Sequence, residues 1–511
     1  MKKSKVLSPL PMFHINIFHG TLQSSLHLTY IIECISIYIT AIFSSGFVIL
    51  QSLTCFVLLT CFPEGQSQNM GIGVGKKSKS KPASAVRKPL PLLFYPVGFF
   101  VTIYFRHAFK HKVDKKAVEG LKPPYLVVAN HSCWLDYMIS AASMYPVRMN
   151  YVGAYNFFRD KVLSKVFTWM GVISKNQFTN DLSSIKKMKS VIQRGGVVAI
   201  YPNGCLSNDG RPGGFAVHGI AKLVRFLNVP VIAVHTNGGY FTRPRWTKRA
   251  RYGRLETTVR PILTVDQIRN LSEDQIYSAV TGALDFDDYA WQRERMIPFK
   301  GRNVAEGVEY VLYKCPKCSA EFTLRSEGDR LYCIECENSV RMNRYMFWEP
   351  EKPDTVYFNG IDKWFDFQKD HLDKEIEAPE FQLSASTRLL CAEPDKYGYQ
   401  HLGNGVVILT RESITYIGLV GDQEKTLIFP MKNILMIPYA AGEYIEVARE
   451  SDISRFVFDD LRQQIKWVMA VRQIRDKYYE RNSKIPSDSV AIVSDSLLQA
   501  KQNQAFTGRR L

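Results

Sequence analysis

A histidine and an aspartate with complementary chemistry stand five residues apart at the end of an apolar run. The stretch is Val127-Val-Ala-Asn-His-Ser-Cys-Trp-Leu-Asp136, in which His131 can accept a proton and Asp136 can orient the imidazole ring. With ten histidines in the chain, a pair at this spacing arises by chance about half a time per sequence of this length. The spacing alone therefore does not indicate a functional pair, and the elements around the two residues must be considered.

The surrounding residues predict that His131 lies between a strand and a helix. Residues 125–129 are β-branched and apolar enough for a buried strand, and apolar residues at helical spacing begin at Leu135. On one continuous helix, side chains five residues apart point about 140° away from each other, so His131 must precede the helix. With Ser132 as N-cap and Asp136 in the first turn, the carboxylate reaches one ring nitrogen and leaves the other free as a base.

Alternating strands and helices predict an α/β domain over residues 89–300. Apolar residues at helical spacing in 182–192 and 220–227 precede apolar strands at 197–201 and 231–234. Such alternation is typical of a mainly parallel sheet covered by helices. Ligands bind these sheets at the carboxyl ends of the strands, which is where His131 is expected.

Three further blocks follow the histidine motif. They are Gly171-Val-Ile-Ser-Lys175, Tyr201-Pro-Asn-Gly-Cys-Leu-Ser207 and Val229-Pro-Val-Ile-Ala-Val234. With Asn130-His131-x4-Asp136, and in this order, they resemble the blocks of the glycerophospholipid (lysophosphatidate-type) acyltransferase family over residues 90 to 300. The resemblance implies direct attack of a substrate hydroxyl on a thioester, with no acyl-enzyme intermediate. It also implies acyl-CoA or acyl carrier protein as co-substrate and no organic cofactor.

The third block departs from the family pattern. Where the family has Pro-Glu-Gly-Thr-Arg-Ser, this chain has Pro202-Asn-Gly-Cys-Leu-Ser207, without the arginine that the resemblance expects on the acceptor's phosphate. Lys175 and Arg211 are cations that can replace it, or they are ordinary surface charges. Asn130 is expected to form an Asx-type turn beside the histidine. The predicted substrate-binding residues are Asn130, Lys175, Asn203, Gly204 and Arg211.

Two cysteines inside these blocks allow a rival mechanism. Cys133 and Cys205 both belong to motif segments, so a thiolate beside His131 is an alternative nucleophile. Buried cysteines that act as small apolar residues are far commoner, and we favour that interpretation for both.

Charge and hydropathy point to a lipid surface. The net charge is +18, and residues 28–62 form an almost uninterrupted apolar stretch that exceeds the ~20 residues needed to cross a bilayer. We expect one span at about 36–62, with the basic linker up to residue 88 and the catalytic domain on the cytoplasmic side. The alternative is a mis-assigned start, with Met70 as the true one. Residues 90–105 are expected to be an interfacial or re-entrant helix, with a core helix or a second span as alternatives.

Two Cys-x2-Cys pairs predict a metal site in the second half of the chain. Fourteen residues separate the two pairs, a spacing that matches a four-cysteine structural zinc ribbon over 308–345. Redox dithiols and a site that has lost its metal are the alternatives. The predicted ligands are Cys315, Cys318, Cys333 and Cys336.

The remaining chain divides into three segments. Residues 346–384 are a charged connector, 385–481 hold five short strands and a terminal amphipathic helix, and 482–511 are a polar, disordered tail. Strands packed by a terminal helix resemble a pleckstrin-homology or GRAM-type module, whose lipid binding rests on analogy. The five strands are expected at 406–409, 414–417, 426–429, 444–447 and 455–458.

The sequence thus predicts a multidomain, membrane-associated O-acyltransferase that acylates the hydroxyl of a lysophospholipid such as 1-acylglycerol 3-phosphate. A catalytically silent membrane adaptor is the alternative, because the third block is altered and two modules are appended. The basic stretch 243–254, with Trp246 and Tyr252 inside it, fits nucleic acid, lipid headgroups or coenzyme A phosphates, or a solvated loop. In a chain with an apolar span the lipid and coenzyme A interpretations are favoured, and nucleic acid is not expected.

Overall fold

The computed structural model describes residues 86–176, 181–214, 219–392, 397–449 and 452–479. All of them belong to one compact unit, residues 78–511. The predicted span at about 36–62, most of the basic linker and the tail 482–511 lie outside the described residues. Within the described ranges, no helix combines the length and the apolar character needed to cross a membrane.

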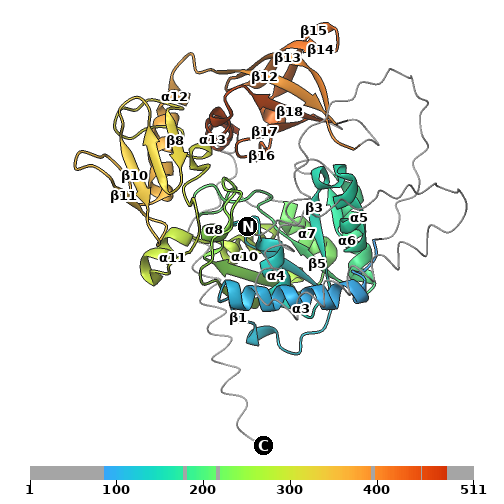
Figure 1. Ribbon diagram of the computed structural model, residues 1–511. Helices are drawn as coiled ribbons and strands as arrows, with labels where there is room; N and C mark the ends of the chain where they lie inside the picture. Colours follow the sequence, from blue (N-terminus) through green and yellow to red (C-terminus); the bar gives the residue numbers. More distant parts are fainter. Residues whose placement is uncertain (1–85, 177–180, 215–218, 393–396, 450–451, 480–511) are drawn as a thin grey trace, which may run out of the picture. The chain divides into compact units, whose positions relative to one another are not determined.

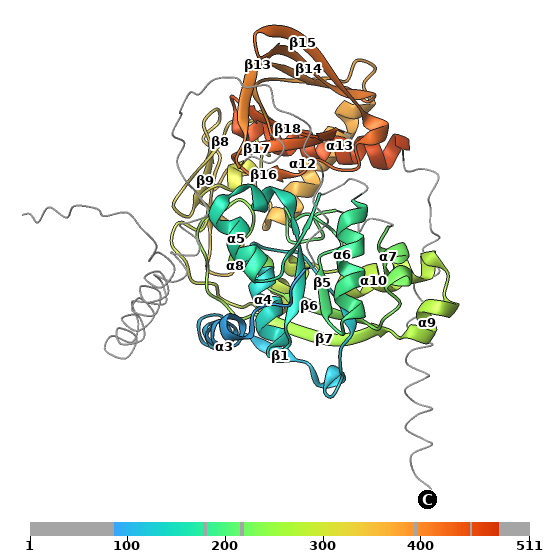
Figure 2. The ribbon, with the colours of Figure 1, turned by 90° about the vertical axis from the view of Figure 1, so that its right-hand side faces the viewer.

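A seven-stranded sheet forms the centre of the N-terminal half (Figures 1 and 2). Its strand order is β1-β7-β6-β2-β5-β3-β4. Pairing is parallel along β6-β2-β5-β3-β4 and between β1 and β7, and only β6 and β7 pair antiparallel. The predicted, mainly parallel sheet is confirmed. The strands are β1 (Lys112–Asp114), β2 (Tyr125–Ala129), β3 (Met149–Ala154), β4 (Ile173–Lys175), β5 (Val197–Ile200), β6 (Val231–Asn237) and β7 (Glu256–Leu263).

Helices cover both faces of this sheet because the side chains of its central strands alternate between two apolar cores. Val128 and its neighbours on one face pack against α6, α7 and α10, whereas Val127 and its neighbours on the other face pack toward the end of α4. Figure 2 shows α6, α7 and α10 together on one side of the sheet. The helices are α4 (Asp136–Met144), α5 (Lys161–Trp169), α6 (Leu182–Gln193), α7 (Gly219–Leu227), α8 (Gly239–Thr242), α9 (Val265–Asn270), α10 (Glu273–Leu284) and α11 (Asp288–Arg295).

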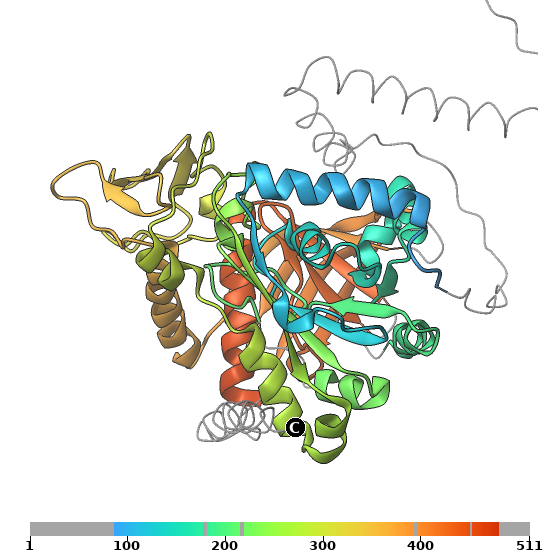
Figure 3. The ribbon, with the colours of Figure 1, turned by 90° about the horizontal axis from the view of Figure 1, so that it is seen from below.

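The apolar segment predicted at 90–105 is helix α3 (Pro91–Ala108). Phe105 is fully buried in a small core that includes residues of the histidine motif, among them Leu135 of the turn before α4. The opposite side of α3 leaves large apolar side chains in solvent, with Leu92 91%, Phe99 50% and Phe100 52% exposed. In Figure 3 this helix, in blue, lies along the outside of the sheet domain. It therefore has one core face and one apolar face that no other described residue covers, called here the unpartnered face.

A four-stranded antiparallel sheet with the order β11-β10-β9-β8 follows. Its strands are β8 (Leu324–Glu327), β9 (Arg330–Cys333), β10 (Ser339–Met342) and β11 (Trp348–Pro350). The range expected to be a charged connector contains a long helix, α12 (Ile361–Glu377). Its buried residues Trp364, Gln368, Leu372 and Ile376 recur every four positions among charged neighbours, and this sparse spacing concealed the helix in the sequence.

The C-terminal half ends in a seven-stranded antiparallel sheet with the order β15-β14-β13-β12-β18-β17-β16. The five predicted strands lie within β13, β14, β15, β17 and β18. Strand β12 was missed because two of its three buried positions, Ala385 and Thr387, are small residues that give a weak alternation of apolar side chains, and β16 because it has two residues. The resemblance to a pleckstrin-homology or GRAM-type module stays a prediction. The elements are β12 (Leu383–Cys391), β13 (Gln400–Leu409), β14 (Ser413–Val420), β15 (Gln423–Pro430), β16 (Tyr439–Ala440), β17 (Tyr444–Arg449), β18 (Asp452–Phe458) and the terminal helix α13 (Gln464–Ile474).

Candidate active site

His131 and Asp136 meet at the carboxyl end of β2. The imidazole Nδ1 of His131 lies 2.9 Å from Oδ2 of Asp136. The histidine side chain is 24% exposed, whereas the aspartate side chain is 4% exposed. Within the described part of the chain, Nε2 of the ring has no hydrogen-bond partner and is not enclosed. A buried carboxylate at one nitrogen and an accessible second nitrogen form the arrangement that a general base needs.

The carboxylate of Asp136 accepts several hydrogen bonds within the turn that precedes α4. Its Oδ2 also accepts the backbone N–H groups of Ser132 at 2.5 Å and Cys133 at 2.9 Å, and its Oδ1 accepts Ser132 Oγ at 3.1 Å. Helix α4 begins at Asp136 with Leu135 as N-cap, so the prediction of Ser132 as N-cap was wrong. The reason is that the Ser132 hydroxyl donates to the carboxylate, which itself satisfies the amides of the turn.

The thiolate alternative is not supported at either cysteine. Cys133 is fully buried and its thiol donates to Asp136 Oδ1 at 3.2 Å. Burial, reinforced by the charge of Asp136, raises the pKa of the Cys133 thiol well above its ordinary value. Burial also raises the pKa of Cys205, although nearby arginines oppose it. Both cysteines therefore favour the neutral thiol, which is a poor nucleophile.

Tyr201 supports the face of the histidine ring, a role that the sequence did not reveal. Its ring lies 4.5 Å from the His131 ring, centroid to centroid, with 29° between the two planes. The Tyr201 hydroxyl is 2.8 Å from Ser140 Oγ on α4, which also lies 2.8 Å from the Tyr151 hydroxyl. Its place at the head of the third block, directly before Pro202, was the available signal.

Asn130 joins two strands instead of forming an Asx-type turn. Its carboxamide nitrogen donates to the carbonyl of Thr236, and its carboxamide oxygen accepts the N–H of Thr236, both at 2.8 Å. The expected turn was wrong because β6 offers both backbone partners opposite the end of β2. Asn130 is buried and holds the residue before His131 in place.

The other predicted substrate-binding residues are engaged to different degrees. Asn203 donates to the carbonyl of Gly214 at 2.6 Å, and Gly204 takes a left-handed backbone with φ +65°. Arg211 forms ion pairs with Asp209 and, at 2.7 Å, with Asp366 of α12. Lys175 ends β4, and the strand order places β4 three strands from β2, a lateral distance of about 14 Å. Their substrate contacts stay predictions.

A family comparison covers this site. Residues 105–236, which include the histidine motif and the blocks at 171–175, 201–207 and 229–234, match the model of the acyltransferase family. These residues form an acyltransferase-type domain, called here the acyltransferase domain. The solved structure of the 1-acyl-sn-glycerophosphate acyltransferase PlsC from Thermotoga maritima is similar at 16% identity, with 39% of this chain and 80% of that chain covered and a TM-score of 0.31. A likeness at this level does not transfer the substrate of that protein. A comparison with curated proteins finds no match.

The basic stretch 243–254 is largely internal to the acyltransferase domain and its neighbours. Arg245 is 8% and Arg251 2% exposed. The Arg251 guanidinium lies 4.6 Å from the centre of the Trp246 ring, and burial lowers its pKa to about 10. Arg254 pairs with Glu256 at 3.1 Å. The solvated-loop interpretation is wrong for Arg245 and Arg251, because both are buried. Buried side chains do not form a nucleic-acid-binding surface either.

The four predicted metal ligands come together outside the acyltransferase domain. Their sulfur atoms all lie within 4.8 Å of one another. The Cys315 and Cys336 sulfurs are 3.6 Å apart, and the Cys318 and Cys333 sulfurs are 3.8 Å apart. Four sulfurs placed tetrahedrally around zinc with bonds of about 2.3 Å are separated by about 3.8 Å. All four cysteines are free thiols, so the cluster has the donor set and the spacing of a tetrahedral metal site.

Proposed function

We propose that the chain is a membrane-associated O-acyltransferase that moves a fatty acyl group from acyl-CoA or acyl carrier protein to a lysophospholipid hydroxyl, such as that of 1-acylglycerol 3-phosphate. The observation that carries the proposal is the 2.9 Å contact between His131 Nδ1 and Asp136 Oδ2, with the other ring nitrogen accessible. The match of residues 105–236 to the acyltransferase family supports the reaction class.

In the proposed reaction, Nε2 of His131 removes the proton of the acceptor hydroxyl as its oxygen attacks the thioester carbonyl. The new C–O bond forms, the C–S bond breaks, and the departing thiolate takes the proton from the imidazolium to leave as a free thiol. The carboxylate of Asp136 holds the ring through Nδ1 and stabilises the positive charge that develops on it. No bond forms between the acyl group and the protein.

Helix α3 is the proposed contact with the bilayer. Its unpartnered face presents half-exposed phenylalanines, among them Phe99 and Phe100. Arg106 lies in its last turn, and Lys110 and Lys112 follow the helix. An apolar face that ends in cations suits the boundary between acyl chains and anionic headgroups. We place the acyltransferase domain on the cytoplasmic side of the membrane, in line with the basic linker that precedes α3.

We also propose that the four-cysteine cluster binds a structural zinc ion. The fit of the sulfur separations supports it, and four protein ligands leave no open position for catalysis. Purified protein is expected to contain about one zinc per chain, and replacement of Cys318 by serine is expected to remove it. Cys391→Ser, which changes a cysteine on β12 away from the cluster, is the control. A zinc content unaffected by Cys318→Ser would contradict the assignment.

The proposed activity is tested by thiol release from palmitoyl-CoA and from a palmitoylated acyl carrier protein, with a panel of lysolipid acceptors. Release that depends on an acceptor is expected, and the best acceptor identifies the headgroup. Tight lipid binding without turnover on either donor would favour the adaptor alternative, which the altered third block motivates.

A further inference from the structure

The segment from Asn203 to Gly214, called here the third-block loop, is fixed against the histidine motif. The N–H of Ser207 donates to the carbonyl of His131 at 3.1 Å. All residues from Cys205 to Gly210 are buried, although connecting segments normally lie on the surface. Because this loop bonds directly to the backbone of His131, whatever holds the loop also helps to hold the histidine.

The C-terminal sheet contacts the third-block loop through Tyr439. The hydroxyl of Tyr439, on β16, donates to Oδ1 of Asn208 at 2.6 Å. The same oxygen accepts Nη1 of Arg245 at 2.9 Å, and Nη2 of Arg245 donates to the carbonyl of Tyr439 at 2.8 Å. The guanidinium also lies 3.7 Å from the centre of the Tyr439 ring. All three residues are buried, so Asn208, Arg245 and Tyr439 form one closed polar cluster.

Two other elements of the C-terminal half reach the same loop. Arg472 of α13 donates to the carbonyl of Gly213 at 3.4 Å, and Asp366 of α12 pairs with Arg211 at 2.7 Å. The loop therefore meets β16, α12 and α13 at separate points. A Cβ atom on Gly214 would lie 2.3 Å from the methyl carbon of Met436, which shows how closely the segment before β16 approaches.

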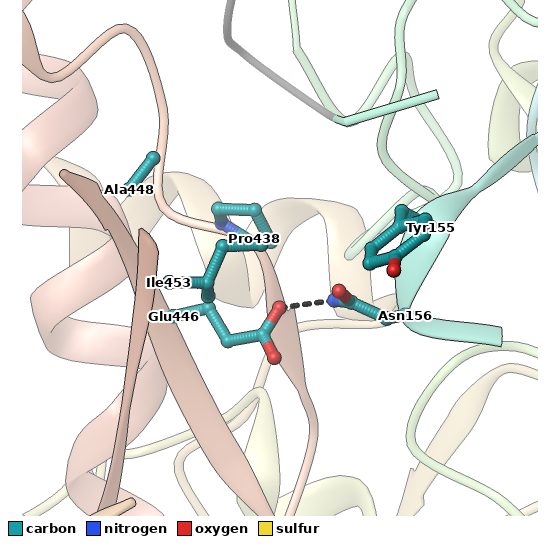
Figure 4. A pocket seen from close by; sticks show the side chains of 6 residues that line it. All are labelled: Tyr155, Asn156, Pro438, Glu446, Ala448 and Ile453. Atoms are coloured by element: carbon teal, nitrogen blue, oxygen red, sulfur yellow. Dashed lines mark hydrogen bonds between the residues drawn. The ribbon is translucent and has the colours of Figure 1, made fainter. Parts of the chain in front are cut away.

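The C-terminal sheet is anchored at a second place on the acyltransferase domain. Glu446 of β17 accepts a hydrogen bond from Asn156, in the short helix η2 (Tyr155–Arg159) (Figure 4). It also accepts one from Arg455 of β18. The space beside these residues, which Figure 4 shows, has a volume of ≈ 10 Å³, enough for about one water molecule. The sheet and the domain are thus packed together here, with no room for a lipid.

These contacts lie beside the position at which the third block lacks the arginine of the family pattern. The arginine that the family pattern expects inside the block is Leu206 here, and a buried arginine, Arg245, reaches the carbonyl of Leu206 from outside at 3.3 Å. Nη1 and Nη2 of Arg245 donate to Leu206, Asn208 and Tyr439, whereas its buried Nε has no partner within the described part of the chain, so the two terminal nitrogens serve the loop and the residue that covers it.

We infer that the C-terminal sheet helps to hold the active site in its catalytic geometry. Tyr439, through Asn208, is then a positioning residue for acyl transfer by His131. The inference rests on the proposed acyltransferase function. It differs from an independent lipid-binding module, because a module that only recruits the protein to a membrane needs no buried contact with the loop beside the histidine.

The test compares Tyr439→Phe with Tyr416→Phe in the full chain. Tyr416 is buried in the same sheet, and its hydroxyl donates to the carbonyl of Leu419 at 2.8 Å, so both variants lose one hydroxyl and one hydrogen bond. Tyr439→Phe is expected to lower kcat for palmitoyl-CoA by roughly 3- to 10-fold, the range that one lost hydrogen bond allows, with the KM for the donor unchanged. Tyr416→Phe is expected to leave kcat within about 2-fold.

A cycle with Asn208→Ala tests the pathway from the other side of the contact. If Tyr439 acts through Asn208, the double variant loses no more kcat than Asn208→Ala alone. Full additivity of the two losses would contradict action through Asn208.

Amide hydrogen exchange in residues 203–214 provides a readout that does not require turnover. Exchange there is expected to be faster in Tyr439→Phe than in Tyr416→Phe, because local opening follows the loss of the cluster. Equal exchange and equal kcat in the two variants would overturn the inference. If the wild-type protein showed no acyl transfer at all, the proposed function would fail, and the exchange comparison alone would decide whether the sheet holds the loop.

Discussion

The ring of Tyr201 stacks on the imidazole of His131, with 4.5 Å between the ring centroids. This contact fixes the plane of the histidine, while Asp136 fixes its direction through Nδ1. Replacement of Tyr201 by leucine removes the stacked ring and is expected to lower kcat about 10-fold or more, as small displacements of a catalytic group do. Tyr201→Phe keeps the ring and loses only the contact with Ser140, so it is expected to stay within about 3-fold. Equal kcat values for the two variants would contradict a role for the stacked ring.

Gly239 lies too close to the catalytic pair to carry a side chain. A Cβ atom there would stand 2.2 Å from Ser132 Oγ and 3.5 Å from Asp136 Oδ1. Ser132 is fully buried and can make room only by giving up its bond to Asp136. Gly239→Ala is expected to lower acyl transfer by at least about 10-fold. Gly282→Ala, in α10 with open space around the glycine, is the matched control and is expected to keep full activity. An active Gly239→Ala protein would show that the bond between Ser132 and Asp136 is dispensable.

Asp288, which lies next to Gly239 and α8, is expected to make the stability of the protein depend on pH. It is fully buried and accepts the N–H groups of Gly238 and Tyr240 at the start of α8. Burial raises its pKa to about 7, with a smaller contribution from the charge of Asp136, although the two hydrogen bonds oppose the rise. The unfolded value is about 3.9, so the folded state binds more protons between these two pH values.

The sign of the effect follows from this difference in bound protons. The contribution of Asp288 to the free energy of unfolding is complete below pH ~4 and is lost as the pH rises through about 7. Asp288→Asn is expected to lower Tm at pH 5, because its amide cannot accept both N–H groups, and to reduce the fall in Tm between pH 5 and 8. Thermal unfolding across this pH range measures both. A fall of the same size in the variant would assign the pH dependence to other groups.

The unpartnered face of α3 makes a prediction about vesicle binding. A chain that begins at Met70 keeps the compact unit 78–511 intact and omits the apolar stretch at 28–62. In this chain, replacement of both Phe99 and Phe100 by serine is expected to weaken binding to anionic phosphatidylglycerol vesicles at least ~10-fold. The control replaces Ile417 and Ile428 by serine; these two residues are 49% and 60% exposed on the C-terminal sheet. Equal binding by both double variants in a sedimentation assay would remove α3 as the contact.

The local parts of the site could be predicted from the sequence, and the distant contacts could not. The pairing of His131 with Asp136 and the strand that precedes them follow from a ten-residue stretch, because spacing and hydropathy act over that range. Details that depend on neighbouring strands were wrong, as Asn130 shows by bonding to Thr236 on β6. The contact between Asn208 and Tyr439 joins residues 231 positions apart, and no local pattern encodes it. The same holds for the burial of Arg245 and Arg251, because the basic stretch around them indicated contact with lipid headgroups or coenzyme A phosphates, or a solvated loop.

The proposed role of His131 as the base of an acyl transfer is tested by measuring acceptor-dependent thiol release from palmitoyl-CoA by His131→Ala. His401→Ala, which changes an exposed histidine on β13, is run beside it, and binding of palmitoyl-CoA is measured for both. His131→Ala is expected to lose about 10³-fold or more of this activity, with donor binding retained and with full activity in the control. Acceptor-dependent release by His131→Ala within 10-fold of the wild-type rate would exclude His131 as the base.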